Sequence, residues 1–152
     1  MTVQRKLSRQ IGKNRELAQQ LWASNCYDAK VLGLLIDDPK QVTFEQAEQQ
    51  VEQLEAGMLC HVFSSCDATL AKSPISFELT QQWLKSSDPT RRKCAFGLVY
   101  ELSKKKSKAY TNEFFMSVIN DIANNYPLES KAVKLAMGLS LIHISEPTRR
   151  SR

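Results

Sequence analysis

The sequence predicts an all-α protein, and three observations lead to this prediction. The 152 residues include only five glycines and five prolines, and 8% are aromatic, which does not favour a sheet-rich fold. Helix-capping residues precede segments in which apolar residues recur every three or four positions. These segments are about 10–16 residues long and are joined by short connections, as in helical bundles and arrays.

Four helices are predicted in the first half of the chain, over residues 15–24, 27–36, 43–54 and 58–71. Asn14 precedes the first of them and is a good N-cap residue. Thr43 begins the third, and Thr43 and Gln46 have the spacing of a reciprocal capping box. The fourth carries little charge, which predicts a central position.

Four more helices are predicted over residues 75–86, 89–106, 112–126 and from about residue 130. Asp88 and Pro89 mark the start of the second of these, because proline at the first helical position loses no needed hydrogen bond. Thr111 caps the third. Each helix pair is too thin to bury its own core, so a stacked helical array is predicted, with a compact irregular bundle as the alternative.

Composition limits the class of protein. No apolar run approaches the roughly 18 residues that span a bilayer, and the start "MTVQRKLSRQ" lacks the apolar stretch of a signal peptide. We therefore expect a soluble, cytoplasmic monomer without membrane contact.

The four cysteines, Cys26, Cys60, Cys66 and Cys94, are scattered and form no C-x-x-C pair. They are predicted to be small buried side chains in helices rather than disulfide partners. Cys60 and His61 are adjacent and diverge on a helix, so no metal site is predicted. We expect no cofactor.

The last fourteen residues, "LSLIHISEPTRRSR", show no apolar period. They contribute two of the five net positive charges, so the body of the chain is only mildly basic. The run is similar to an in-frame translation of a transposase-type sequencing adapter. We therefore expect a domain fragment over residues 1–138 and a non-native, unstructured tail over 139–152. A DNA-binding arm or an ordinary surface tail are the alternatives.

Three stretches carry a resemblance to a known family: "IGKNRELAQQLWASNCYDAKVLGLLIDDPKQVT", "LAKSPISFELTQQWLKSSDPTRRKCAFGLVYEL" and "ESKAVKLAMG". Together they resemble the DNA alkylation repair family, whose HEAT-like-repeat members are related to alkylpurine DNA glycosylases. The resemblance implies a HEAT-like array of helix pairs, truncated here at its C-terminus. It also implies a concave basic face that holds double-stranded DNA, possibly alkylated.

The resemblance places the family's catalytic positions on this chain. A tryptophan and a carboxylate four residues later fall at Leu59 and Phe63. The family's arginine falls at Lys93, or at Arg92 with a shift of one residue, and a second tryptophan falls near Leu135. The usual glycosylase residues are therefore missing at three of four positions.

One other carboxylate is a candidate for catalysis. Asp67 lies one helical turn beyond Phe63, on a similar face of the predicted helix. A lone aspartate is more often a local cap or a paired surface group.

Arg91, Arg92 and Lys93 are the predicted DNA-binding residues. They follow Pro89 in the first turn of a helix, where cations oppose the helix dipole, so phosphate contact is a reason for their presence. The lysines of "KKKSK" close the same helix and are expected to form a solvated face.

The sequence thus predicts a DNA alkylation repair-like protein that binds duplex DNA without the usual glycosylase residues. Two alternatives remain open: an alkylpurine DNA glycosylase with a rearranged site around Asp67, and a helical protein-interaction scaffold.

Overall fold

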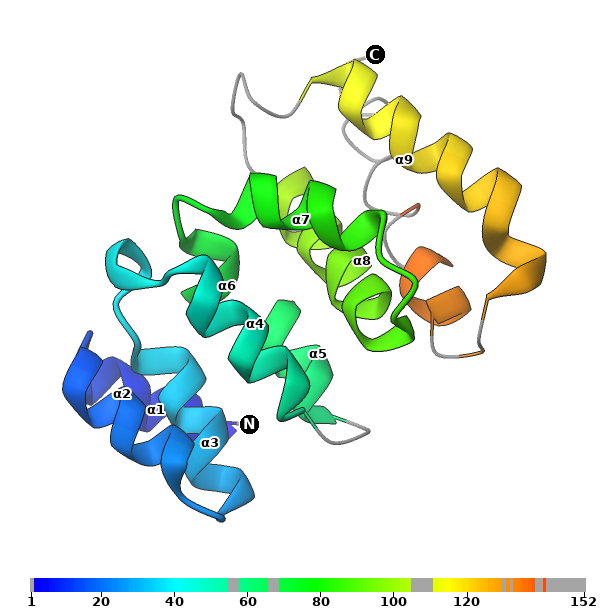
Figure 1. The fold of residues 1–152 in the computed structure, drawn as a ribbon. Coiled ribbons are helices and arrows are strands. Elements are labelled where there is room, and N and C mark those ends of the chain that lie inside the picture. The colour runs from blue at the N-terminus through cyan, green and yellow to red at the C-terminus, as the bar shows by residue number, and fades with distance from the viewer. Residues whose placement is uncertain are drawn as a thin grey trace. The chain divides into compact units, whose positions relative to one another are not determined.

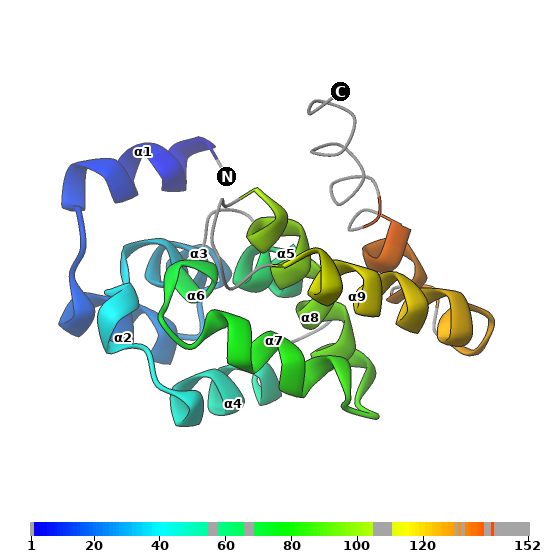
Figure 2. The same ribbon diagram turned by 90° about the horizontal axis from the view of Figure 1, so that it is seen from above.

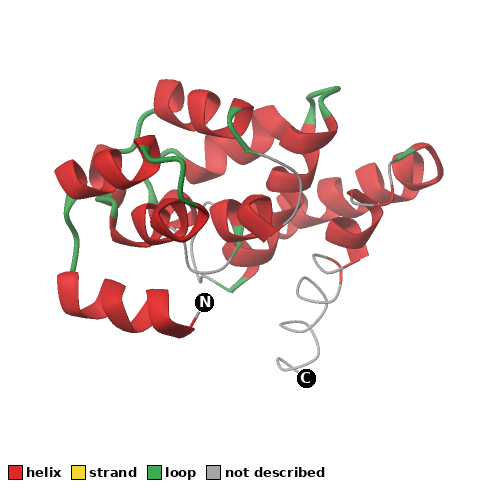
Figure 3. Ribbon diagram, turned by 90° about the horizontal axis from the view of Figure 1, so that it is seen from below, coloured by secondary structure: helices red, strands yellow, loops and turns green. Residues whose placement is uncertain are grey.

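A computed structural model describes residues 2–54, 58–65, 69–104 and 111–129, and beyond these 131, 133–138 and 141. In these ranges the regular structure is helical throughout, as the colours of Figure 3 show. The prediction of an all-α fold is confirmed. Among the residues described, no helix is both long and apolar enough to span a membrane.

The helices divide between two compact units, Met1–Ser76 and Phe77–Arg152 (Figure 1). The elements are α1 (Thr2–Ile11), α2 (Arg15–Ala23), α3 (Tyr27–Ile36), η1 (Pro39–Gln41), α4 (Phe44–Glu52), α5 (Met58–Ser64), α6 (Thr69–Lys72), α7 (Ser76–Leu84), α8 (Pro89–Ser103), α9 (Asn112–Asn125) and η2 (Tyr126–Leu128). Residues 133–138 are also helical, in agreement with the last predicted helix.

Capping side chains begin the helices where the sequence places them. Asn14 Oδ1 accepts a hydrogen bond from the Leu17 amide at 3.0 Å, and Asp88 Oδ1 accepts from the Thr90 amide at 3.2 Å. Thr111 Oγ1 accepts from the Phe114 amide at 3.2 Å. These bonds satisfy amide groups that have no partner within the helix, so the predicted helix starts are confirmed.

The predicted capping box at α4 is only half formed. Thr43 Oγ1 accepts from the Gln46 amide at 3.1 Å, as predicted. The Gln46 side chain does not return the bond: its Nε2 donates to Asp37 at 2.8 Å, and its buried Oε1 has no hydrogen-bond partner. A tertiary contact has therefore replaced the local one, so this part of the prediction is wrong.

Helix α3 is the centre of the first unit, with six consecutive buried residues from Val31 to Ile36. It packs against α2, and Gly33 allows the two helices to approach closely. A β-carbon at Gly33 would lie only 3.0 Å from the carbonyl oxygen of Ala18. Ala18, Leu32 and Ile36 form a buried cluster there.

Helix α1 was not among the predicted elements. It carries a narrow apolar stripe whose members Val3 and Leu7 are exposed, while Ile11 packs against the cluster of α2 and α3. Gln4 Nε2 also donates to Asp28 at 2.9 Å, which ties α1 to the start of α3. Figure 2 shows α1 from above.

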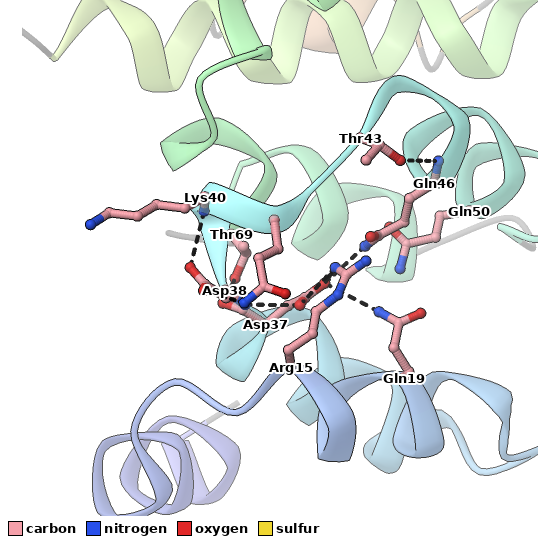
Figure 4. Close-up of polar contacts among 10 residues, drawn as sticks. Arg15, Gln19, Asp37, Asp38, Lys40, Thr43, Gln46, Gln50 and Thr69 are labelled. Carbon is pink, nitrogen blue, oxygen red and sulfur yellow. Dashed lines mark hydrogen bonds and ion pairs between the residues drawn. The ribbon is translucent and has the colours of Figure 1, made fainter.

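The turn "DDP" after α3 joins several helices of the first unit (Figure 4). Arg15 of α2 donates to both carboxylate oxygens of Asp37 at 3.0 Å, and Gln46 of α4 donates to Oδ2. Thr69 of α6 donates its hydroxyl to the Asp37 carbonyl at 3.0 Å. The Asp37 side chain is only 5% exposed, so this carboxylate is a buried hub of the unit.

The neighbouring Asp38 has a local role. Its side chain caps η1 by accepting from the Lys40 amide at 3.0 Å and from Gln41 Nε2 at 2.8 Å. The hydrogen bonds from Gln41 and from the Lys40 amide hold the pKa of Asp38 below its ordinary value.

The second unit has its own apolar core. Seven buried side chains from α8, α9 and the following helical segment form it: Phe96, Val99, Phe114, Val118, Ile122, Val133 and Met137. Phe77 of α7 meets the Phe114 ring edge-on, with 4.9 Å between centroids. Leu141 also packs against this core, while 139, 140 and 142–152 lie outside the described residues. The boundary at residue 138 stays a prediction.

Two further details differ from the predictions. Cys26 is exposed and serves as the N-cap residue of α3, so it is not a buried helical side chain, whereas Cys60 and Cys94 are buried in helices as predicted. The helix predicted over 58–71 appears as α5 and α6, with Cys66 in the gap outside the described residues.

Candidate nucleic-acid interface

The basic residues predicted to bind DNA lie in the first turn and a half of α8. Asp88 caps this helix, and its second carboxylate oxygen accepts from Arg91 Nη1 at 2.7 Å. The Arg91 side chain is 18% exposed. Its pairing with the cap carboxylate offsets the unfavourable placement of a cation at a helix N-terminus.

Arg92 is almost completely buried and forms the centre of an ion-pair network. Its Nη2 lies 3.1 Å from Asp121 Oδ2 and 2.5 Å from Glu129 Oε1. Its Nη1 donates to the carbonyl oxygen of Leu84. The guanidinium also lies 5.6 Å from the centre of the Phe96 ring. Arg92 thus joins α7, α8, α9 and the segment after η2.

These contacts give Arg91 and Arg92 stabilising roles that the sequence does not reveal. The sequence favours Arg91 and Arg92 as phosphate ligands because it shows no stabilising role for cations at that position. The structure supplies such a role for both, through Asp88 for Arg91 and through two carboxylates for Arg92. The ion pairs of Arg92 involve Asp121 and Glu129, which lie 29 and 37 residues away, so no local pattern reveals them.

Lys93 is half-buried, which leaves part of its side chain open to solvent. At the other end of α8, Lys104 lies 3.5 Å from Glu101 and 4.4 Å from the centre of the Tyr100 ring. The remaining lysines of the "KKKSK" run lie outside the described residues. Arg91 and Lys93 at the start of α8 keep part of their side chains exposed, as does Lys104 at its end.

Three of the four positions that the family resemblance assigns to catalysis are apolar. Leu59 and Phe63 lie on α5 and are 5% and 0% exposed. Leu135, the position of the second tryptophan, is 67% exposed. Nothing at Leu59 or Phe63 offers a charge to a developing sugar cation.

Phe63 and Asp37 line a common cavity of about 10 Å³. A cavity of that size holds about one water molecule and no nucleotide. The carboxylate of Asp37 is also engaged by Arg15 and Gln46. Asp37 is therefore a structural carboxylate. Asp67, the predicted catalytic candidate, lies outside the described residues.

Within the described ranges, no group of three His, Cys, Asp or Glu residues is placed to hold a metal ion. Trp22 and Trp83 are buried, and the indole nitrogen of Trp22 donates to Gln53 Oε1 at 2.6 Å. Both tryptophans thus have packing roles.

Comparisons with known proteins agree on the fold. The family profile described as "DNA alkylation repair enzyme" matches residues 1–151. A solved structure described as belonging to "a new family of proteins related to the HEAT-like repeat DNA glycosylases with affinity for branched DNA structures" matches with a TM-score of 0.85 at 21% sequence identity. The match covers 95% of this chain and 61% of that chain, so this chain spans less than two thirds of the solved protein. No curated protein sequence matches significantly. The predicted HEAT-like fold is confirmed.

Proposed function

Because the chain belongs to the DNA alkylation repair enzyme family, we propose that it binds duplex DNA through the phosphate backbone without the family's usual base-excision chemistry. The observation that carries this proposal is the burial of Leu59 and Phe63 in the apolar core of the first unit. Phe63 stands at the family's carboxylate position, so the chain keeps the fold without the charge that is needed there at the sugar.

Arg91 and Lys93 are the residues that we propose to contact phosphates. Both lie near the start of α8 and keep part of their side chains exposed. Arg92 belongs to the same predicted set, and its ion pairs with Asp121 and Glu129 suit it to holding α8 in place. Contacts of this kind neutralise phosphate charge and carry no sequence information, so binding is expected to be independent of DNA sequence.

An assay on methylated duplex DNA tests the proposal. We expect the protein to bind this DNA and to release no more 7-methylguanine than a buffer control, because apolar side chains stand at the catalytic positions. Binding is measured by a gel shift and release by chromatography of the free base, both in the same reaction. An active alkylpurine glycosylase serves as the positive control.

Robust release of the base that disappears in Asp67→Asn would contradict this account and support the glycosylase with a rearranged site. Absence of DNA binding at low salt would instead favour the protein-interaction scaffold. The solved relative has affinity for branched DNA. A competition between a linear duplex and a four-way junction of equal length shows whether that preference extends to this chain.

A further inference from the structure

A second basic feature lies in the first unit. It is a hollow of about 450 Å³ between α1, the turn that follows it, α3 and α6. Four cationic side chains line it: Arg5 and Arg9 from α1, Lys13 from the turn, and Lys72 from the end of α6. No carboxylate is among its described lining residues.

The walls of the hollow are held by specific contacts. Gly12 ends α1 with a φ of 74°, a conformation that glycine adopts without strain, and its amide donates to the Ser8 carbonyl at 2.9 Å. This turn places Lys13 beside α3, where its Nζ donates to the Leu35 carbonyl oxygen at 3.1 Å. The turn that ends α1 and the hydrogen bond to α3 together fix the position of the Lys13 side chain.

Lys13 and Lys72 are close enough for their positive charges to interact. Burial lowers the pKa of the Lys13 ammonium group below its ordinary value, and the charge of Lys72 lowers it further. Asp37 and Asp38 act in the opposite direction but do not cancel the effect. An anion in the hollow would favour the charged form of Lys13 and offset its interaction with Lys72.

We propose that this hollow binds a phosphate group. Two arginines and two lysines supply the charge-assisted donors that phosphate oxygens prefer. The volume falls in the range of ordinary ligand sites and leaves room for a phosphodiester with ordered water. Leu35 is the apolar side chain in its described lining, so an apolar ligand fits poorly.

The phosphate has two possible sources, the DNA backbone and a free phosphate compound, and the experiment separates them. The test variant is Lys13→Gln/Lys72→Gln in the full chain. The control is Lys6→Gln/Lys40→Gln, which removes the same charge from exposed lysines of the same unit that do not line the hollow. Circular dichroism verifies that both are folded, and Arg5→Gln/Arg9→Gln is an independent second test variant.

In the DNA arm, duplex affinity is measured against salt concentration. If the hollow holds a backbone phosphate, the slope of log affinity against log salt becomes shallower by about 0.9 in the test variant and stays nearly unchanged in the control. In the phosphate arm, 10 mM pyrophosphate replaces DNA. Millimolar binding would raise the melting temperature of the unmodified protein and the control by roughly 3–5 °C, and that of the test variant by much less.

A selective effect in either arm supports the phosphate site and identifies its source. The DNA arm rests on the proposed function, whereas the pyrophosphate arm does not. If the protein fails to bind DNA but pyrophosphate stabilises it selectively, the proposed function fails and the hollow stands. If the test variant and the control behave alike in both arms, the hollow is not a phosphate site.

Discussion

Replacement of Asp37 by alanine is expected to lower the free energy of unfolding by about 3 kcal/mol, near the lower end of the range for breaking a buried ion pair. The carboxylate is 5% exposed and binds Arg15 through both oxygens at 3.0 Å. It also accepts from Gln46, whose Oε1 is already without a partner. Its removal leaves a guanidinium and a buried amide without their acceptor.

Asp38→Ala is the matched control, because it removes the same charge from the next residue. Asp38 makes only local bonds, to Lys40 and Gln41, so the effect of its removal is expected to be clearly smaller. Urea denaturation followed by circular dichroism measures both. Similar decreases in stability at the two positions would show that the Asp37 carboxylate does not hold α2 and α4 together.

Replacement of Arg92 by alanine is expected to cost about 3–5 kcal/mol of stability in the second unit. The change leaves Asp121 and Glu129 without their shared cation in a mostly buried setting. It also removes the donor to the Leu84 carbonyl. Arg92→Lys restores one charge but not the planar fork, so an intermediate decrease in stability is expected.

Arg91→Ala is the comparison for Arg92, because it removes the same side chain from the adjacent position. Arg91 is paired with a partly exposed carboxylate, and pairs of this kind contribute about 1 kcal/mol or less. Denaturation midpoints of Arg91→Ala and Arg92→Ala, measured in parallel, distinguish the two roles. If Arg91→Ala is as destabilising as Arg92→Ala, the network around Arg92 is not what fixes α8.

Local patterns in the sequence are sufficient to predict most of the helices. Capping residues such as Asn14, Asp88 and Thr111 act within three residues of their own position, so their bonds follow from the sequence alone. Helix α1 escapes prediction because two of the three residues of its stripe, Val3 and Leu7, remain exposed. Its position depends on Ile11 and on the hydrogen bond from Gln4 to Asp28, which join it to distant residues.

The candidate site is less predictable, because the roles of its residues depend on partners that lie far away in the sequence. The sequence places Arg91, Arg92 and Lys93 side by side and gives no reason to separate them. The structure separates them: Arg92 pairs with Asp121 and Glu129, while Arg91 and Lys93 stay partly exposed. The hollow with Lys13 and Lys72 brings together residues 59 positions apart, which no spacing rule would connect.

The absence of the family's catalytic residues is, by contrast, a prediction that the sequence alone supplies. The resemblance assigns Leu59 and Phe63 to those positions, and the structure adds that both are buried. Their burial adds information, because an apolar residue at a catalytic position could still lie on a surface that DNA reaches. An apolar side chain enclosed by the core supplies neither a charge nor an open position for substrate.

The measurement that tests the central claim most directly is duplex DNA affinity as a function of salt. We expect two duplexes of unrelated sequence to bind with the same slope of log affinity against log salt. In Arg91→Gln/Lys93→Gln the slope should be shallower by about 0.9 for each DNA phosphate that the protein no longer neutralises. The control Lys85→Gln/Lys131→Gln removes two exposed lysines of the same unit and should change it little. Absence of binding at low salt, or a slope that the Arg91/Lys93 change leaves as steep as the control, would contradict the proposal that this protein holds the DNA backbone at the start of α8.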